Sequence, residues 1–121
     1  MKKEQVLYSF WNSFQIPAYD ENSVPENAPF PRITYESAMD SFGGELALTA
    51  SIWDRSTSWA YISAKAETIA ADITRGGKII RTDTGSAWIK RGSPFAQRMA
   101  GDNDSIRRMI LNITVEFFDQ D

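Results

Sequence analysis

Residues 105–118 constrain the fold of this chain more than any other segment, because polar and apolar residues alternate along most of it. Successive side chains of a β-strand point to opposite faces, so this pattern predicts one long strand. One face carries Arg107, Met109, Leu111, Ile113, Val115 and Phe117. The other carries Arg108, Asn112, Thr114 and Glu116. A strand with a single apolar face predicts a sheet that is buried on one side.

Four more strands are predicted, as two hairpins: 32–39 with 45–53, and 78–83 with 86–91. Paired glycines make a turn of residues 40–45, and Thr84-Gly85 joins the second hairpin. Residues 94–100 are expected to form a helical turn or a loop, followed by a turn at 101–104. Either the 32–53 hairpin or the strand at 107–117 can be the exposed edge of the sheet; the sequence leaves this open.

Two amphipathic helices are predicted, over residues 3–14 and 57–75, because apolar residues recur in them three and four positions apart. Ser56 or Thr57 is expected to cap the second helix, and Gly76-Gly77 to end it. Residues 15–31 contain four of the five prolines and are expected to form a loop or arm.

These elements follow the order helix, hairpin, helix, hairpin, long strand. We therefore expect a single α+β domain over residues 1–121, with a mostly antiparallel sheet of about five strands. Both amphipathic helices should pack on one face of that sheet.

The chain contains no cysteine and no histidine. These absences exclude disulfides, thiolate zinc sites, cysteine nucleophiles and imidazole acid–base chemistry. No carboxylate pair takes their place, so we expect a binding or assembly protein instead of an enzyme, with no metal site. The sequence contains no run of about eighteen apolar residues, so it predicts no membrane-spanning helix.

Charge is unevenly distributed along the chain, whose net charge is −3. Residues 1–60 carry four basic and eight acidic side chains, whereas residues 75–108 carry eight basic and three acidic ones. Oppositely charged regions favour self-association or charged partners. The candidate interface residues are Arg55, Lys90, Arg91, Phe95, Arg98, Asp20 and Glu21. Trp53 and Trp88 have no certain place in the core, and an aromatic beside these cations fits a protein interface better than a nucleic-acid site.

Several blocks of sequence resemble the tail terminator proteins, also called tail completion proteins, of long-tailed phages and prophages of Gram-positive bacteria. The blocks are SFWNSFQIPAYDENSVPENAPFPRITYE (9–36), ALTASIWDRSTSW (47–59), RGGKII (75–80), WIKRGSPFAQRM (88–99) and SIRRMILNITVEF (105–117). The resemblance extends over nearly the whole chain. It involves no catalytic signature.

The resemblance implies an α+β domain that forms a homohexameric ring on the head-proximal end of the tail tube. Such a ring stops tube growth and provides the surface for head–tail joining. Its partners would be further copies of the chain, the major tail tube protein and a head completion protein. It would need no cofactor, and genome DNA would pass through it. The expected location is the virion, after assembly in the host cytoplasm.

Two alternatives remain from the sequence. Head–tail connector proteins of the neck have a similar size and related folds. A small cytoplasmic module that binds a peptide or nucleic acid is the second alternative.

Overall fold

A computed structural model describes residues 1–38, 44–100 and 103–119. A short helix α1 (Val6–Trp11) lies between two 3₁₀ turns, η1 (Lys3–Gln5) and η2 (Asn12–Phe14), and a longer helix α2 spans Ala60–Ile73. The strands are β1 (Ala18–Asp20), β2 (Arg32–Tyr35), β3 (Glu45–Arg55), β4 (Lys78–Thr82), β5 (Gly85–Met99) and β6 (Ile106–Asp119).

The six strands form one sheet in the order β1-β2-β3-β6-β5-β4. All neighbours are antiparallel except β1 and β2, which run parallel, so the sheet is mixed. The predicted long strand is confirmed as β6, and it lies in the interior between β3 and β5. Neither segment considered as an edge from the sequence is one, because the two outer strands are β1 and β4.

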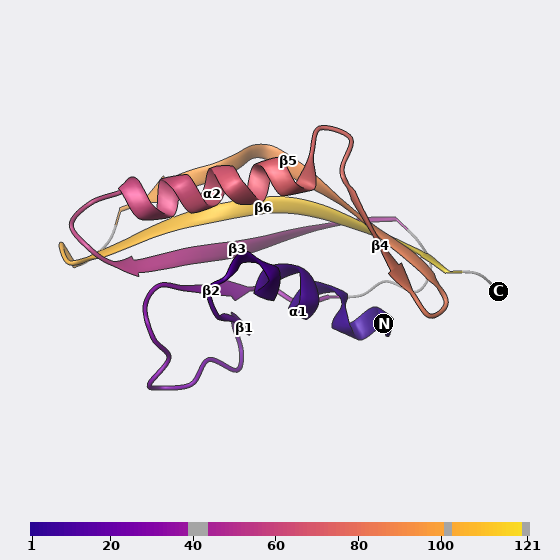
Figure 1. Cartoon of the computed structure of the whole chain (residues 1–121), viewed down its shortest axis with the longest axis horizontal. Coiled ribbons are helices and arrows are strands. Elements are labelled where there is room, and N and C mark those ends of the chain that lie inside the picture. The colour runs from indigo at the N-terminus through magenta and orange to yellow at the C-terminus, as the bar shows by residue number, and fades with distance from the viewer. Residues whose placement is uncertain (39–43, 101–102, 120–121) are drawn as a thin grey trace.

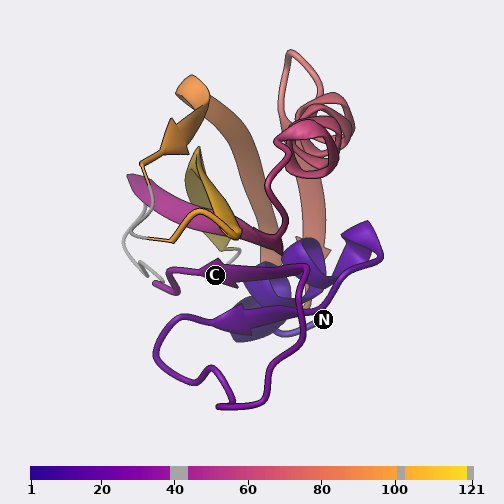
Figure 2. The ribbon, with the colours of Figure 1, turned by 90° about the vertical axis from the view of Figure 1, so that its left-hand side faces the viewer.

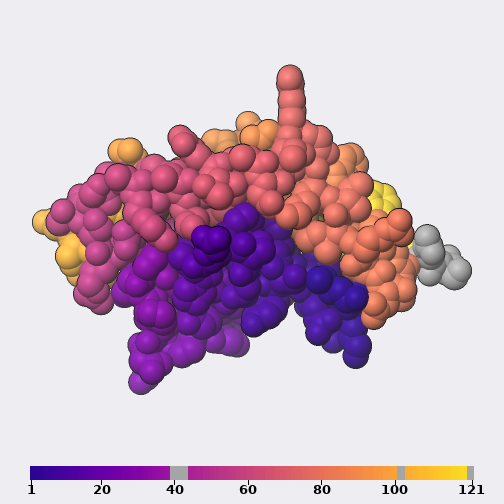
Figure 3. Space-filling view, in the orientation of Figure 1, coloured from indigo at the N-terminus to yellow at the C-terminus, as the bar shows by residue number. Residues whose placement is uncertain are grey.

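Both helices cover the same face of a strongly curled sheet (Figures 1 and 2). The core lies between them and the apolar face of β6, whose Met109, Leu111, Ile113, Val115 and Phe117 are all buried. In the space-filling view the N-terminal segment and α2 meet over this face (Figure 3). The predicted stripes of both helices supply the other side of the core, with Trp11 1% and Ile69 0% exposed. The expectation that both helices pack on one face is therefore confirmed.

Two predictions about strands are wrong. Residues 94–100 were expected to be helical or irregular, yet β5 continues to Met99 after a β-bulge between Arg91 and Ala96. The bulge lets Pro94, which has no backbone N–H to donate, sit within a strand. Residues 15–31 were expected to be a loop, yet this range contains β1, which pairs with the following strand β2. The sheet therefore has six strands, not about five, and two consecutive strands β1 and β2 precede β3.

The helix ends also differ from expectation. Helix α2 begins at Ala60, with Trp59 at the N-cap, and the Ser58 hydroxyl accepts from the Ala60 N–H at 3.1 Å, so Ser56 and Thr57 are not its caps. It ends at Ile73 rather than at the glycine pair, because the C-cap Thr74 takes a positive φ of 64°. Most of the predicted turn at 40–45, and part of the one at 101–104, lies outside the described residues.

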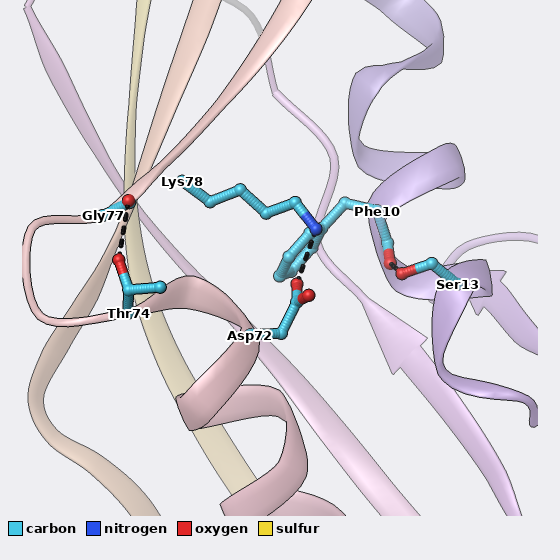
Figure 4. A network of polar contacts seen from close by, with 6 residues as sticks. All are labelled: Phe10, Ser13, Asp72, Thr74, Gly77 and Lys78. Carbon is cyan, nitrogen blue, oxygen red and sulfur yellow. Dashed lines mark hydrogen bonds and ion pairs between the residues drawn. The ribbon is translucent and has the colours of Figure 1, made fainter.

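A polar junction joins α2 to β4 beside α1 (Figure 4). The Lys78 ammonium pairs with the Asp72 carboxylate at 2.7 Å and lies 5.9 Å from the centre of the Phe10 ring. The Thr74 hydroxyl donates to the Gly77 carbonyl at 3.0 Å. At the other end of the hairpin, the hydrogen bond from Lys3 lowers the pKa of the Asp119 carboxyl. The Lys78–Asp72 pair attaches β4 to α2, and the Lys3–Asp119 pair attaches the end of β6 to the N-terminal segment.

Asn12 closes the outer edge of β1. Its side-chain carbonyl accepts from the Ala18 N–H at 3.1 Å, and its amide donates to the Ala18 carbonyl at 3.2 Å. We predict that Asn12→Ala lowers the free energy of unfolding by about 1–3 kcal/mol, because these half-buried backbone groups lose their partners. Urea unfolding measures the change. Asn22→Ala, in the exposed loop, is the control and should shift stability by less than about 0.5 kcal/mol; equal effects would refute the prediction.

Candidate interaction surface

Five arginines gather at one end of the sheet, which we call the arginine end: Arg32, Arg55, Arg98, Arg107 and Arg108. β2 begins here, β3 and β5 end here, and β6 begins here, so four strands bring their arginines together (Figure 1, left). Figure 2 looks onto this end. The cluster is a product of strand register, since its members are up to 76 positions apart in sequence.

Three of these arginines lie over aromatic rings on the face of the sheet that no helix covers. Arg108 lies 4.5 Å from the centre of the Trp53 ring, and Arg32 lies 4.2 Å from that of Phe30. Arg55 approaches the Phe30 ring to 4.8 Å. Each such contact contributes about 0.5–2 kcal/mol, depending on how far it is shielded from water.

The other two arginines flank Trp59 on the helical side. Arg98 lies 4.9 Å and Arg107 5.5 Å from the centre of its indole ring. Arg107 also donates to the carbonyl of Thr57 at 3.1 Å, which ties β6 to the segment before α2. The arginine end therefore includes side chains on both faces of the sheet.

Hydrogen bonds fix the orientation of several side chains on the uncovered face. The Trp53 indole N–H donates to the Thr34 hydroxyl at 3.0 Å, and Arg108 Nε donates to the Ser51 hydroxyl at 3.0 Å. Arg32 donates to the carbonyl of Ala28 at 3.0 Å. Because one side of each group is held within the protein, these side chains have little conformational entropy left to lose on binding a partner.

None of the eight arginines in the chain forms an ion pair with a carboxylate of the described residues. The four ion pairs there use the N-terminal ammonium, Lys3, Lys78 and Lys90 instead. A guanidinium carries five N–H donors and matches carboxylate or phosphate oxygens in two-point contacts. Among the described residues, the arginine end thus presents positive charge that no ion pair compensates.

The structure brings together two of the residues predicted as interface residues, Arg55 and Arg98. Both are exposed at the arginine end. Lys90 lies farther along the uncovered face, where it pairs with Glu45 and sits 4.4 Å from the centre of the Trp88 ring. Arg91 is exposed at the start of the bulge in β5. The interface role of all four stays a prediction.

The remaining predicted residues lie elsewhere. Phe95 is in the bulge, where it packs against the core and lines an open hollow of about 220 Å³ beside α2. Asp20 ends β1 and accepts a hydrogen bond from the Asn22 N–H at 2.9 Å, which forms a tight turn. Glu21 is exposed at the start of the loop that leads to β2, and this loop projects from the body of the molecule (Figure 3).

Sequence reasoning did not single out Phe30, Arg32 and Trp59. Arg32 opens a strand in the position that alternates with buried Ile33, which marks it as facing away from the core. Its proximity to Trp53 follows from the β2–β3 register, in which the two residues are directly opposite. No single-sequence pattern reports that register.

Within the described ranges, no group of three or more acidic side chains is placed to hold a metal ion. No helix in the same part of the chain is both long and apolar enough to cross a membrane.

Comparison with known proteins gives one structural likeness to report. No protein-family model matches the chain, and no curated protein sequence does. A solved structure described as the virion of a native gene transfer agent particle aligns with a TM-score of 0.48 and 19% identity. The alignment covers 94% of this chain and 85% of that chain.

Tyr35 gives a test of the environment at the β1 edge. Burial raises the pKa of its phenol, and the nearby Asp20 carboxylate and Tyr8 add to the rise. The neutral phenol is therefore favoured in the folded state. Its contribution to stability is complete below the unfolded pKa of about 10 and is lost as the pH rises through the folded value.

We predict that the free energy of unfolding falls less between about pH 9 and about pH 12 in Tyr35→Phe than in the unsubstituted protein. Denaturant titrations across this range measure the difference. Tyr61→Phe is the control, since Tyr61 is 42% exposed. Parallel pH profiles for Tyr35→Phe and the unsubstituted protein would show that the phenol is not buried in this way.

Proposed function

We propose that this protein is a tail terminator of a long-tailed phage. In this proposal six copies form a ring on the head-proximal end of the tail tube, end its growth and present the surface to which the head joins. The resemblance of five sequence blocks suggests this role. The α+β architecture, a sheet with helices on one face, agrees with what the resemblance implies.

The observation that carries the proposal is the arginine end with its uncompensated charge. Subunits of a closed ring meet through two unlike surfaces, because each copy contacts its two neighbours differently. The five arginines provide one such surface. The second consists of two exposed carboxylates in the loop after β1, Glu21 and Glu26, which form no ion pair within the described residues. In this proposal the carboxylates of one copy face the arginine end of the next, since opposite charges favour such contact.

A ring contact of this kind would be weak for an isolated pair of subunits. Exposed ion pairs contribute about 0–1 kcal/mol each and are screened by salt. The tube end can supply the remaining contacts by holding several copies close together. The free protein is therefore expected to be monomeric at moderate concentration, and the ring to form on the tube.

The first test is electron microscopy of the protein with tail tubes of its own phage. We predict that density binds to one tube end and halts growth there, and that Arg55→Glu with Arg98→Glu reduces the capped fraction at least about tenfold, because like charges then meet. The matched control is Lys2→Glu with Arg75→Glu, two exposed cations that lie outside the arginine end and are not candidate interface residues. Equal capping by both variants would contradict a role for the arginine end, whereas bare tubes with the unsubstituted protein would contradict the terminator function.

A charge-swap experiment tests which surfaces meet. Glu21→Lys with Glu26→Lys is expected to reduce capping as the arginine reversals do. Combining all four reversals should restore capping, because the attraction is re-formed with opposite signs. Thermal melting serves as the control for folding. Loss of capping in the fourfold variant would show that the two surfaces do not contact each other.

A further inference from the structure

The two outer strands of the sheet differ in how their free backbone groups are used. On β1, Asn12 binds the N–H and the carbonyl of Ala18, and the Asp20 carbonyl accepts from the Ser23 N–H at 2.9 Å. This edge is therefore largely closed. The second half of β5 also lies at the rim beyond β4, but its ladder is interrupted by the bulge and by Pro94. Such features prevent a further strand from pairing.

The outer edge of β4 carries neither a bulge nor a proline. A two-residue turn joins β4 to β5, so Thr82 and Gly85 form a hydrogen-bonded pair and alternate residues point outward. Ile79 and Arg81 therefore direct their backbone N–H and carbonyl away from the sheet. The Asp83 N–H has the same direction and is taken by the Met1 carbonyl at 2.8 Å. Among the residues described, none forms a hydrogen bond to the outward groups of Ile79 or Arg81.

An apolar patch lies next to this edge on the uncovered face of the sheet. Ile79 is 67% exposed and lies opposite Trp88 in the ladder, and Phe118 is 44% exposed. The centres of the Trp88 and Phe118 rings are 6.5 Å apart. An open hollow of about 330 Å³ borders Ile79, Arg81 and Phe118. Exposed apolar area beside unpaired backbone groups is the combination that strand addition uses.

We propose that β4 accepts an added β-strand from an extended segment of a partner protein. The backbone of the segment pairs with Ile79 and Arg81, and an apolar side chain of the segment packs on Ile79 and Phe118. A carboxylate two residues away meets Arg81, which has no ion pair within the described part of the chain. This inference goes beyond the proposed ring and does not depend on it.

A second copy of β4 is a poorer occupant than such a segment. β4 carries Lys78 and Arg81 and no acidic residue. Lys78 is already paired with Asp72, so self-pairing would bring two Arg81 side chains to one short strand pair without a carboxylate on either strand. A strand with alternating apolar and acidic side chains complements both the apolar patch and the charge of Arg81.

The test tethers a probe strand to the protein, because a short free peptide binds too weakly to give a clear answer. The chain has no cysteine, so Arg75→Cys in the exposed turn before β4 gives a single attachment point. The probe is the capped peptide Thr-Val-Thr-Glu-Thr-Val-Thr, joined through a Gly-Ser linker and a terminal cysteine. The matched control replaces both of its valines with proline.

Amide hydrogen exchange by NMR measures the result. We expect exchange at Ile79 and Arg81 to slow at least about fivefold with the probe, while the proline peptide has no effect. Ile79→Pro, which removes one outward N–H at an edge position that tolerates proline, should abolish the protection at Arg81. Arg81→Ala should weaken it and leave the folded spectrum intact.

Three outcomes would overturn the proposal. The first is unchanged exchange at both amides with the tethered probe. The second is equal protection by the proline peptide. The third is protection at Ile79 and Arg81 that appears without any probe as the protein concentration rises, since this would identify a second copy as the occupant. None of them bears on the ring, so the two proposals can fail separately.

Discussion

The buried face of β6 is the constraint on which the rest of the structure depends. Its five apolar residues from Met109 to Phe117 are at most 8% exposed, and burial of each stabilises the fold by about 1.5–3 kcal/mol. A shift of one residue in register would turn all of them to water. The registers of β3 and β5 against β6 are therefore fixed, and both helices must lie on the same side to cover this face.

Covering one face leaves the other without a second layer, and the side chains of that face compensate for it. Trp53 does not pack under a helix; Arg108 lies over its ring and Thr34 accepts its indole N–H. The long stem of an arginine can shield apolar surface while its charged head stays in water. An uncovered sheet face can thus keep large aromatic residues, while its arginines form no ion pair within the described residues.

The sequence was sufficient for those parts of the fold that have their own periodicity. The alternation of 105–118 predicted β6, and the helical stripes predicted the face on which α1 and α2 pack. It failed where strand formation depends on a partner. β1 lies in a proline-rich segment and pairs because β2 and Asn12 satisfy its backbone, while β5 continues past Pro94 because the bulge accommodates it.

The candidate surface was less accessible to sequence reasoning for a related physical reason. Arg55 and Arg98 were identified from charge and aromatic content. Their neighbours Arg32 and Trp53 join them through cross-strand register, and Trp59 joins them because the start of α2 lies against Arg98 and Arg107. Charge alone also does not reveal which cations are compensated, since Lys90 has Glu45 beside it and the arginines have no such partner in the described chain.

The arginine end and the outer edge of β4 offer different interactions to a partner, and these interactions act over different distances. Charge at the arginine end attracts a partner over roughly 10 Å at moderate ionic strength and weakens with salt. The open backbone groups of β4 act only on contact, require an extended chain and respond little to salt. Electrostatic attraction mainly accelerates association, whereas backbone hydrogen bonds slow dissociation. A protein with one surface of each kind can therefore be attracted to a partner by charge and held there by strand pairing.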